Sequence, residues 1–287
     1  MKKVLGVLLA LGMLLAVACA EAPQMTVEEY PRVDGSTATL PLSYALMAEV
    51  TGISQEEAKD YITHNRTTGS FYKLVDGEAD ILLVGKPAQE ALEYAQEKGV
   101  ELEIKPIGVD ALVFLISDQN PVDSLTKEQV VGIYSGEITN WRQVGGEDLP
   151  IRAYQRNETA GSQVMMKNVV MGEVEMTDAP VEYRPGDMAG LVEVIASYRN
   201  TADAIGYSVY FYVTNMYIQQ GIKLLEVDGV APSNETIASG DYPYTQEYLC
   251  VIRKDAAEDS PERRLFNYLT SEEGKQLIAE NGYVPCA

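Results

Sequence analysis

The feature that most constrains the fold is a regular alternation of strand-like and helix-like segments along the chain. Apolar residues recur at a helical spacing over residues 40–51, and a helix near 69–76 leads into an apolar strand at 79–84. The pattern continues to helices within residues 261–281. Helices that alternate with apolar strands indicate an α/β fold with mostly parallel sheets covered by helices on both faces. Ligands of such folds bind beyond the carboxyl ends of the strands, where loops lead into helices.

Local signals mark the ends of several further segments. Thr126 precedes a helical run to residue 134 and is a preferred N-cap residue, while Gly136 follows the run and favours a C-terminal stop. We expect the other helices over residues 88–98, 164–170 and 190–199, and the other strands over residues 102–107, 111–116, 205–212 and 247–253. The sequence has no internal repeat and no long linker.

The charge of the chain limits the ligands that it can hold. Its 287 residues include 43 acidic and 22 basic side chains, which gives a formal net charge of −21. Binding to nucleic acid depends on clustered Lys and Arg, and the sequence has no such cluster. A strongly acidic protein also creates no long-range field that attracts anions. Any anion must therefore be held locally, by backbone N–H groups, hydroxyls and a few cations.

The N-terminus has the pattern of an export signal. Lysines precede an apolar run over residues 4–18, which is shorter than the ~20 residues that span a bilayer as a helix. The sequence LAVAC at 15–19 looks like the lipobox of bacterial lipoproteins, in which Cys19 becomes the lipid-modified first residue. We therefore expect a signal peptide over 1–18, a lipidated tether over 19–29 and attachment to the extracytoplasmic face of the cell membrane. The alternative is an ordinary signal peptide with an incidental cysteine.

Two cysteines remain besides the one in the lipobox. Disulfides persist in the oxidising compartment that an exported protein reaches, and the two remaining cysteines, Cys250 and Cys286, could pair with each other. Two interpretations stay open. Either a disulfide attaches the C-terminal tail to the strand over residues 247–253, or the two residues are separate thiols and one of them is buried.

Three loops before predicted helices have a composition that suits an anion. They combine glycine with Ser and Thr at residues 33–39, 63–70 and 156–162, and the third begins with Arg156. A helix N-terminus presents unpaired N–H groups and about half a positive charge, so it binds an oxyanion without net basicity. Hydroxyls add neutral donors, and an arginine adds a bidentate contact. N-capping alone explains one such loop, whereas three in this order indicate an anion site.

Longer pieces of sequence around these loops resemble a known family. Similarity to the phosphate-binding proteins of bacterial ABC transporters extends, in register, over DGST at 34–37, LVDGEADI at 74–81, GEITNWRQVGGEDLPIRAYQRNETAGSQ at 136–163, AIGY at 204–207 and GYVP at 282–285. The resemblance implies the two-lobed fold of type II periplasmic binding proteins. In that fold an anion is enclosed between two α/β lobes, each with a mixed, mostly parallel sheet, and crossover strands join the lobes.

The resemblance also implies, residue by residue, which side chains bind the anion. The matching positions of the three loops are Ser36, Thr37, Thr67, Thr68, Arg156, Gly161 and Ser162. It further implies a first lobe formed by residues 30–108 and 246–287, and a second lobe formed by residues 109–245.

Two positions depart from the pattern of the family. Ala160 stands where the family usually has a serine, and Gly85 lies in the stretch where many phosphate binders carry an aspartate. Such an aspartate accepts the proton of hydrogen phosphate and thereby rejects sulfate. Glu158 and Asp187 are candidates for an acceptor from the other lobe, and Lys86 is expected in solvent at a helix start.

The sequence favours a binding protein over an enzyme. His64 is the only histidine, so the sequence offers no group of histidines for a metal site, and a Ser–His arrangement would depend on His64 alone. We expect His64 in a loop or at the surface, and the alternative is a role in the cleft beside Thr67. We expect a monomer without metal or cofactor that captures inorganic phosphate and delivers it to an ABC transporter permease. The alternatives are a binding protein for another oxyanion or small organic anion, and a surface sensor or adhesion module that retains the fold.

Overall fold

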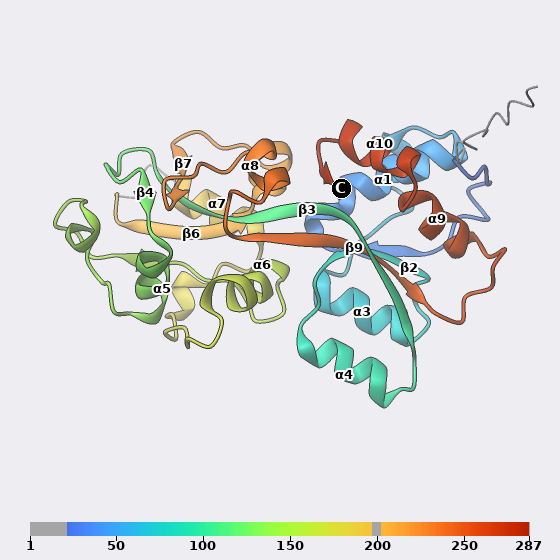
Figure 1. Ribbon diagram of the computed structural model, residues 1–287, viewed down its shortest axis with the longest axis horizontal. Coiled ribbons are helices and arrows are strands. Elements are labelled where there is room, and N and C mark those ends of the chain that lie inside the picture. Colours follow the sequence, from blue (N-terminus) through green and yellow to red (C-terminus); the bar gives the residue numbers. More distant parts are fainter. Residues whose placement is uncertain (1–21, 197–201, 287) are drawn as a thin grey trace, which may run out of the picture.

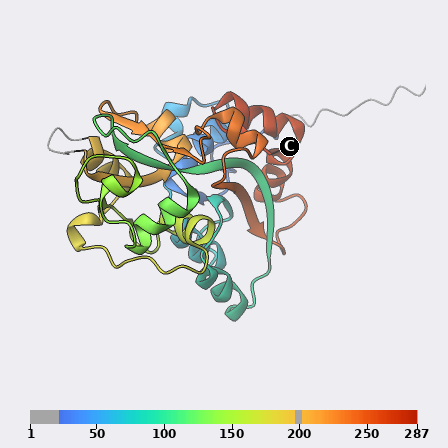
Figure 2. The same cartoon turned by 60° about the vertical axis from the view of Figure 1, so that its left-hand side comes forward.

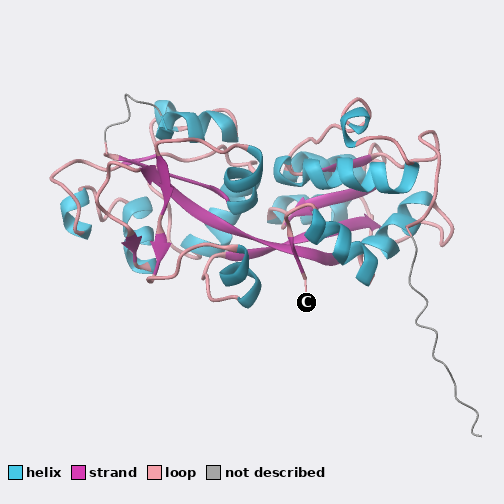
Figure 3. Cartoon of the chain, turned by 90° about the horizontal axis from the view of Figure 1, so that it is seen from above, coloured by secondary structure: helices cyan, strands magenta, loops and turns pink. Residues whose placement is uncertain are grey.

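The computed structural model describes residues 22–196 and 202–286, which form two lobes joined by two long strands (Figure 1). The connecting strands are β3 (Leu102–Ser117) and β9 (Thr245–Arg253). Seen from above, the lobes stand side by side and these two strands run between them (Figure 3). The two-lobed α/β fold predicted from the sequence is confirmed.

Each lobe combines short strands with several helices. The first lobe consists of β1 (Val33–Gly35), a 3-10 turn at Thr37–Thr39, α1 (Leu40–Thr51), α2 (Gln55–Ala58), α3 (Thr67–Val75), β2 (Ile81–Gly85), α4 (Gln89–Glu97), α9 (Pro261–Leu269), α10 (Glu272–Glu280) and β10 (Val284–Pro285). The second lobe consists of β4 (Ser124–Leu125), α5 (Lys127–Ser135), β5 (Arg152–Ala153), α6 (Gly161–Met165), α7 (Met188–Ala196), β6 (Ala204–Val209), β7 (Ile222–Leu224), β8 (Glu226–Val227) and α8 (Asn234–Ser239). Short 3-10 or π segments add Trp141–Val144, Met166–Met171, Val181–Tyr183 and Tyr212–Met216 to the second lobe.

One mixed sheet extends through both lobes. Its order is β1-β2-β9-β3-β6-β5, and β7 and β10 also pair with β3. The pairs β1–β2 and β5–β6 are parallel, as expected for strands linked by helical crossovers. All pairs that involve β3 or β9 are antiparallel, because these strands carry the chain back and forth between the lobes.

The strand β3 corrects the prediction of two strands at 102–107 and 111–116. It is one strand of 16 residues, which curves from the second lobe down to α4 of the first (Figure 2). Pro106 and Gly108 suggest that one strand ends and another begins there. In the structure the strand continues, and only its pairing register with β9 shifts at this point. Pairing on both sides of this shift keeps the strand continuous.

Capping residues place the helix ends close to the predicted positions. Helix α1 has the predicted bounds and ends at Gly52, which adopts the left-handed conformation with φ of 77°. At α5, the Thr126 hydroxyl accepts from the Gln129 N–H at 3.2 Å, and the Gln129 side chain accepts from the Thr126 N–H at 2.8 Å. The predicted strand over 205–212 is shorter, because the chain turns into a helical segment after Val209.

Residues 22–29, predicted as part of a tether, lie against the first lobe. Met25 is 7% exposed, and its N–H donates to the Val50 carbonyl oxygen at 3.0 Å. The Arg264 side chain donates to the Gln24 carbonyl oxygen at 2.8 Å. These residues are therefore part of the folded lobe. The predictions for residues 1–18 and for lipidation of Cys19 fall outside the described residues. Among the residues that the structure does describe, no helix is long and apolar enough to cross a membrane.

Cys250 and Cys286 are free thiols, which corrects the disulfide interpretation. Cys250 pairs with Lys105 on one side of β3, whereas the Cys286 N–H donates to the Ile107 carbonyl oxygen on its other side. Two strand spacings amount to about 10 Å, and a disulfide requires Cα atoms closer than about 7 Å. Burial raises the pKa of the Cys250 thiol, which keeps it unreactive.

Candidate functional site

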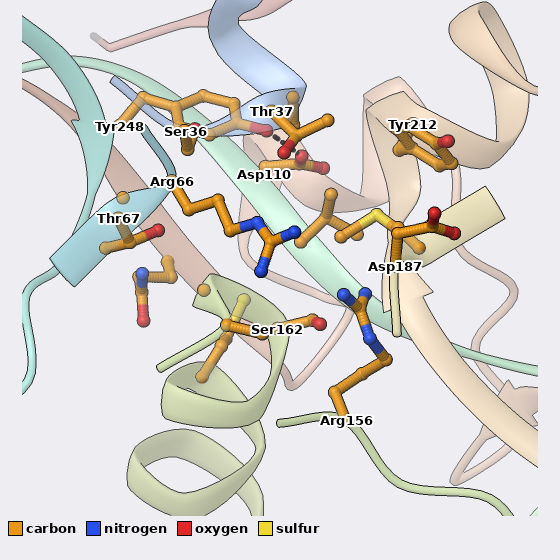
Figure 4. A pocket seen from close by; sticks show the side chains of 18 of the residues that line it. Ser36, Thr37, Arg66, Thr67, Asp110, Arg156, Ser162, Asp187, Tyr212 and Tyr248 are labelled. Atoms are coloured by element: carbon orange, nitrogen blue, oxygen red, sulfur yellow. Dashed lines mark hydrogen bonds between the residues drawn. The ribbon is translucent and has the colours of Figure 1, made fainter. Parts of the chain in front are cut away.

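A cavity of about 280 Å³ lies between the lobes, where β3 and β9 pass from one to the other (Figure 4). The loop after β1 and the start of α3 form its wall on the first lobe. The segment before α6 and the start of α7 form its wall on the second lobe. The predicted site residues that line it are Ser36, Thr37, Thr67, Arg156, Gly161 and Ser162.

The loop after β1 is held in place by β2 and by a half-buried histidine. A Cβ atom at Gly35 would lie 1.9 Å from the Leu83 carbonyl oxygen, so glycine permits this close approach. His64 Nδ1 donates to the Ser36 carbonyl oxygen at 2.7 Å, and His64 Nε2 accepts from the Ser43 hydroxyl at 3.1 Å. Burial lowers the pKa of His64 and favours the neutral ring that makes both contacts. His64 lies in the loop before α3, as predicted, and its ring supports the loop after β1.

The second loop brings a threonine and an arginine to the cavity. Thr67 is 1% exposed and begins α3, two residues earlier than predicted. Arg66 precedes it with φ of 66° and ψ of 169°, a backbone conformation that residues other than glycine rarely adopt. The Arg66 side chain points into the cavity (Figure 4). The chain thus holds an unfavourable conformation at the point where a cation enters the cavity.

The third loop is fixed by hydrogen bonds to its backbone. The Arg156 N–H donates to Gln163 Oε1 and to the Tyr207 hydroxyl, both at 3.1 Å, and Arg156 is 4% exposed. A Cβ atom at Gly161 would lie 2.4 Å from Thr67 Oγ1 of the other lobe. Glycine at the start of α6 therefore lets the two lobes meet at the cavity.

Several buried donors in the cavity wall have no partner among the residues that the structure describes. They are Thr67 Oγ1, Ser162 Oγ, and Nε and Nη1 of Arg156. An unsatisfied buried polar group costs about 1–3 kcal/mol, so native structures rarely leave several together without a ligand. These donors come from both lobes and face the same cavity (Figure 4). Their arrangement fits an anion with several acceptor oxygens.

The two arginines of the cavity are also without a carboxylate partner in the described part of the chain. Most basic side chains of this acidic protein pair with Asp or Glu, as Arg32 does with Asp80 and Arg152 with Asp203. Burial lowers the pKa of Arg156, and the positive charge of Arg66 adds to this effect. Two guanidinium groups that repel each other are stabilised by a shared anion.

A buried carboxylate, Asp110 of β3, lines the cavity beside these donors. Its Oδ1 accepts from the N–H groups of Ala111 at 2.8 Å and Phe211 at 3.1 Å, and the Tyr248 hydroxyl donates to its Oδ2. Burial raises the pKa of Asp110 to about 6, although these hydrogen bonds act in the opposite direction. The carboxylate is therefore mostly ionised at neutral pH.

The other acidic candidates have different roles. Asp187 lines the cavity from the second lobe, is exposed, and accepts from the Gly190 N–H at 2.7 Å, so it caps the start of α7. Glu158 forms an ion pair with Lys167 outside the cavity. Within residues 22–196 and 202–286, no group of three His, Cys, Asp and Glu side chains is arranged to hold a metal ion.

Comparison with known proteins assigns the chain to a family. A family model described as a PBP superfamily domain matches residues 20–273. The chain belongs to the PBP superfamily. The phosphate-binding protein PstS of Borreliella burgdorferi is 25% identical and aligns over 99% of this chain and 99% of its own length. PstS of Bacillus subtilis is also 25% identical, over 99% of this chain and 94% of its own length.

Solved structures of this superfamily share the fold. An ABC-type phosphate transport receptor from Vibrio cholerae superposes with a TM-score of 0.65 at 24% identity, over 88% of this chain and 98% of its own. PstS from Borrelia burgdorferi superposes with a TM-score of 0.56 at 22% identity, over 89% of this chain and 98% of its own. At these identities the structural likeness establishes the two-lobed fold of the PBP superfamily.

The prediction for Thr68 is not supported by the geometry. Thr68 is 1% exposed, and its hydroxyl donates to the Thr159 carbonyl oxygen at 3.4 Å instead of lining the cavity. The reason is helical geometry, because successive side chains on α3 point about 100° apart and only Thr67 faces the cleft. Lys86 is also absent from the cavity wall, as predicted for a residue at a helix start.

Sequence reasoning missed two residues of this PBP superfamily cleft, Arg66 and Asp110. Arg66 stands directly before Thr67 in the loop over residues 63–70, whose composition suits an anion. Its position in that loop is a sequence signal for a cation at the cavity. Asp110 is the single charged residue in the otherwise uncharged run from Ile107 to Ile116. A lone carboxylate inside a buried strand requires partners, and this was the signal for Asp110.

Proposed function

We propose that this protein is an extracytoplasmic solute-binding protein that captures inorganic phosphate between its lobes and delivers it to the permease of an ABC transporter. The observation that carries the proposal is the set of unpartnered buried donors that face one cavity from both lobes. A tetrahedral oxyanion accepts from the Thr67 and Ser162 hydroxyls and from the Arg156 guanidinium at the same time. Phosphate is the anion in the names of the two PstS relatives, which align with nearly the whole chain.

Capture by closure of the lobes follows from the origin of the donors. Ser36, Thr37 and Thr67 belong to the proposed first lobe, residues 30–108 with 246–287, and Arg156 and Ser162 to the proposed second lobe, residues 109–245. An anion that contacts both sets stabilises the closed arrangement over an open one. Gly161 allows the close contact with Thr67 that this arrangement requires.

The remaining parts of the proposal concern partners and location. A lipid on Cys19, after removal of residues 1–18, would keep the lobes at the extracytoplasmic face of the membrane, next to the permease. We propose that a single monomer binds the anion, without metal or cofactor. We propose a binding role without catalysis, in line with the names of the two PstS relatives.

One observation favours a second candidate, a small organic anion. Part of the cavity wall beside the arginines is apolar and consists of Met165, Met188, Val209 and Tyr212. An organic substituent on an anion would pack against this surface. Phosphate remains the preferred ligand because the unpartnered groups are donors that suit four oxygens.

The proposal is tested by titration of phosphate into the Arg156→Ala variant. Loss of hydrogen bonds to a charged group should reduce affinity by about 1.5–3 kcal/mol, roughly 10- to 150-fold. The matched control is Arg142→Ala, since Arg142 is paired with Asp148 on the surface and should have no effect. Equal affinities of wild type and Arg156→Ala would contradict the site.

A further inference from the structure

The C-terminal segment at residues 282–285 contacts the second lobe outside the cavity wall. Its strand β10 lies next to α8 of the second lobe (Figure 1). The ring of Tyr283 stacks on the ring of Phe211, which follows β6, with 3.6 Å between the ring centroids and 12° between the planes. Both residues are buried, and neither lines the cavity. This stack is therefore a contact between the lobes that is separate from the one between Thr67 and Gly161.

The hydroxyl of Tyr283 reaches the start of α1. It donates to the Ala38 carbonyl oxygen at 2.7 Å, and the Leu42 N–H donates to it. Burial raises the pKa of this hydroxyl well above its usual value, so it keeps its proton and remains a donor. In a continuous α-helix the Ala38 carbonyl oxygen would accept directly from the Leu42 N–H. The Tyr283 hydroxyl contacts both groups at the point where the 3-10 turn at Thr37–Thr39 changes into α1.

This 3-10 turn carries the first candidate binding residues of the chain. Ser36 and Thr37 line the cavity from the turn, and so does Ala38. The ring of His64 donates to the Ser36 carbonyl oxygen at one end of the turn, and Tyr283 donates to the Ala38 carbonyl oxygen near the other end. The hydroxyls of Ser36 and Thr37 face an anion only while the turn keeps its conformation. Two side chains from distant parts of the sequence therefore hold this conformation.

Phe211 connects the turn to the crossover strands. Its N–H donates to Oδ1 of Asp110 at 3.1 Å, and the Tyr248 hydroxyl donates to Oδ2 of the same carboxylate. The ring of Tyr248 packs edge-on against that of Tyr283, with 5.8 Å between the centroids. A movement of the second lobe must either separate Phe211 from Tyr283 or pull Tyr283 away from Ala38. The position of the second lobe is thus coupled to the turn that lines the cavity.

We propose that Tyr283 is a positioning residue for anion binding. Stacked on Phe211 in the closed arrangement of the lobes, it holds the turn at Thr37–Thr39 in the conformation that binds the anion. This inference rests on the proposed function, because closure around the anion is part of that function. It adds a residue that lies outside the cavity wall and far in sequence from the three loops that line it.

The test is calorimetric titration of phosphate into the Tyr283→Phe variant. Phenylalanine keeps the ring and its stack on Phe211 but removes the hydrogen bond to Ala38. The Kd for phosphate should rise by at least about threefold, the scale of one lost hydrogen bond. The rate of phosphate dissociation should rise as well, because the turn is less firmly held in the closed protein.

Tyr242→Phe is the matched control. Tyr242 is also buried, and its hydroxyl donates to the Leu112 carbonyl oxygen at 3.1 Å, but it does not line the cavity or contact the turn. This variant loses the same kind of hydrogen bond, so it should lose similar stability in thermal unfolding and keep the Kd of wild type. A merely structural role of Tyr283 would lower the stability of both variants and leave both Kd values unchanged, which would overturn the proposal.

A second variant tests the coupling through the stack. Phe211→Leu removes the stacked ring and leaves the N–H that donates to Asp110 in place. If the two rings act as one unit, the double variant with Tyr283→Phe should bind phosphate about as weakly as the weaker single variant. Effects on Kd that multiply in the double variant would show that the rings act independently, and would contradict the coupling.

The outcomes for the proposed function and for this inference are distinct. A wild type that binds no phosphate would refute the proposed function itself. A wild type that binds phosphate, together with Tyr283→Phe and Phe211→Leu variants that bind it equally tightly, would refute only the role of Tyr283.

Discussion

Arg66 combines an unfavourable backbone conformation with a side chain that enters the cavity. Its φ of 66° and ψ of 169° lie in a region that is essentially restricted to glycine and costs on the order of 1–3 kcal/mol. Such strain persists where the surrounding structure imposes it, typically at ligand sites. Here it aims a guanidinium at the same cavity as Arg156 (Figure 4). The strained residue therefore also lines the proposed binding cavity.

Replacing Arg66 by glycine should separate stability from binding. Relief of strain exceeds the entropic cost of glycine, so Arg66→Gly should raise the free energy of unfolding by about 1 kcal/mol. The same change should lower phosphate affinity by roughly tenfold or more, since a charge-assisted contact is lost. Denaturant unfolding without ligand and calorimetric titration measure the two effects. Arg66→Ala, which removes the side chain but keeps the strain, should lose affinity without gaining stability. A stabilised Arg66→Gly with full affinity would remove Arg66 from the site.

At the residue scale, the sequence indicates which residue types belong to the cavity, but it does not indicate which way their side chains point. Hydroxyl and glycine residues before helices pointed to Ser36, Thr67 and Ser162, which the structure places in the wall of one cavity, because the chemistry expected of an anion site is visible in residue types. The choice between Thr67 and Thr68 depends on which face of α3 turns to the cleft. The lone charge of Asp110 in an apolar run is visible in the sequence, but its place at the cleft depends on where β3 crosses between the lobes. Neither this place nor the choice between the two threonines is readable from local sequence.

At the scale of elements, the cleft is closed by the approach of α3 and α6. The two helices start at Thr67 and Gly161, which belong to different lobes and nearly touch. The Thr68 hydroxyl adds a hydrogen bond to the Thr159 carbonyl oxygen at 3.4 Å across the same boundary. The starts of these two helices therefore line the proposed binding cavity and also form a contact between the lobes.

A methyl group at Gly161 should obstruct this contact. In Gly161→Ala the added Cβ would lie 2.4 Å from Thr67 Oγ1, so the lobes must separate or the threonine must move. We expect phosphate affinity to fall by roughly tenfold or more, with little change in thermal unfolding of the ligand-free protein. Titration of the variant checks this expectation.

Two companion variants make the Gly161 experiment specific. Gly186→Ala has open space around the added methyl group and should behave as wild type. Adding Thr67→Ser to Gly161→Ala keeps the hydroxyl and gives it more freedom to move, so part of the affinity should return. Unchanged affinity in Gly161→Ala would show that the lobes do not meet at these two residues during binding.

Element ends were more predictable than element pairing. Thr126 and Gly136 marked the two ends of α5 correctly, because capping depends on neighbouring residues alone. The continuity of β3 was not predictable, since Pro106 and Gly108 look like a break in isolation. The strand is held by partners from distant parts of the chain, β9 and β10, which no local pattern specifies.

At the scale of the whole molecule, the proposed anionic ligand must be bound despite the negative charge of the protein. A net charge of −21 opposes the approach of any anion. Most of its arginines and lysines are paired with carboxylates, whereas Arg66 and Arg156 have no such partner among the described residues and meet in the cleft. Binding should therefore weaken less with added salt than in a protein that attracts anions over long distances, because short buried contacts are little screened.

The most direct test of the central claim is calorimetric titration of the protein, stripped of bound anion, with phosphate and then with sulfate. The account predicts one phosphate per chain, bound tightly, with little or no heat from sulfate. Phosphate at 100 times its Kd should also raise the free energy of unfolding by about 2.7 kcal/mol. A protein that binds neither anion, and whose unfolding phosphate does not shift, would contradict the assignment of phosphate to this cleft.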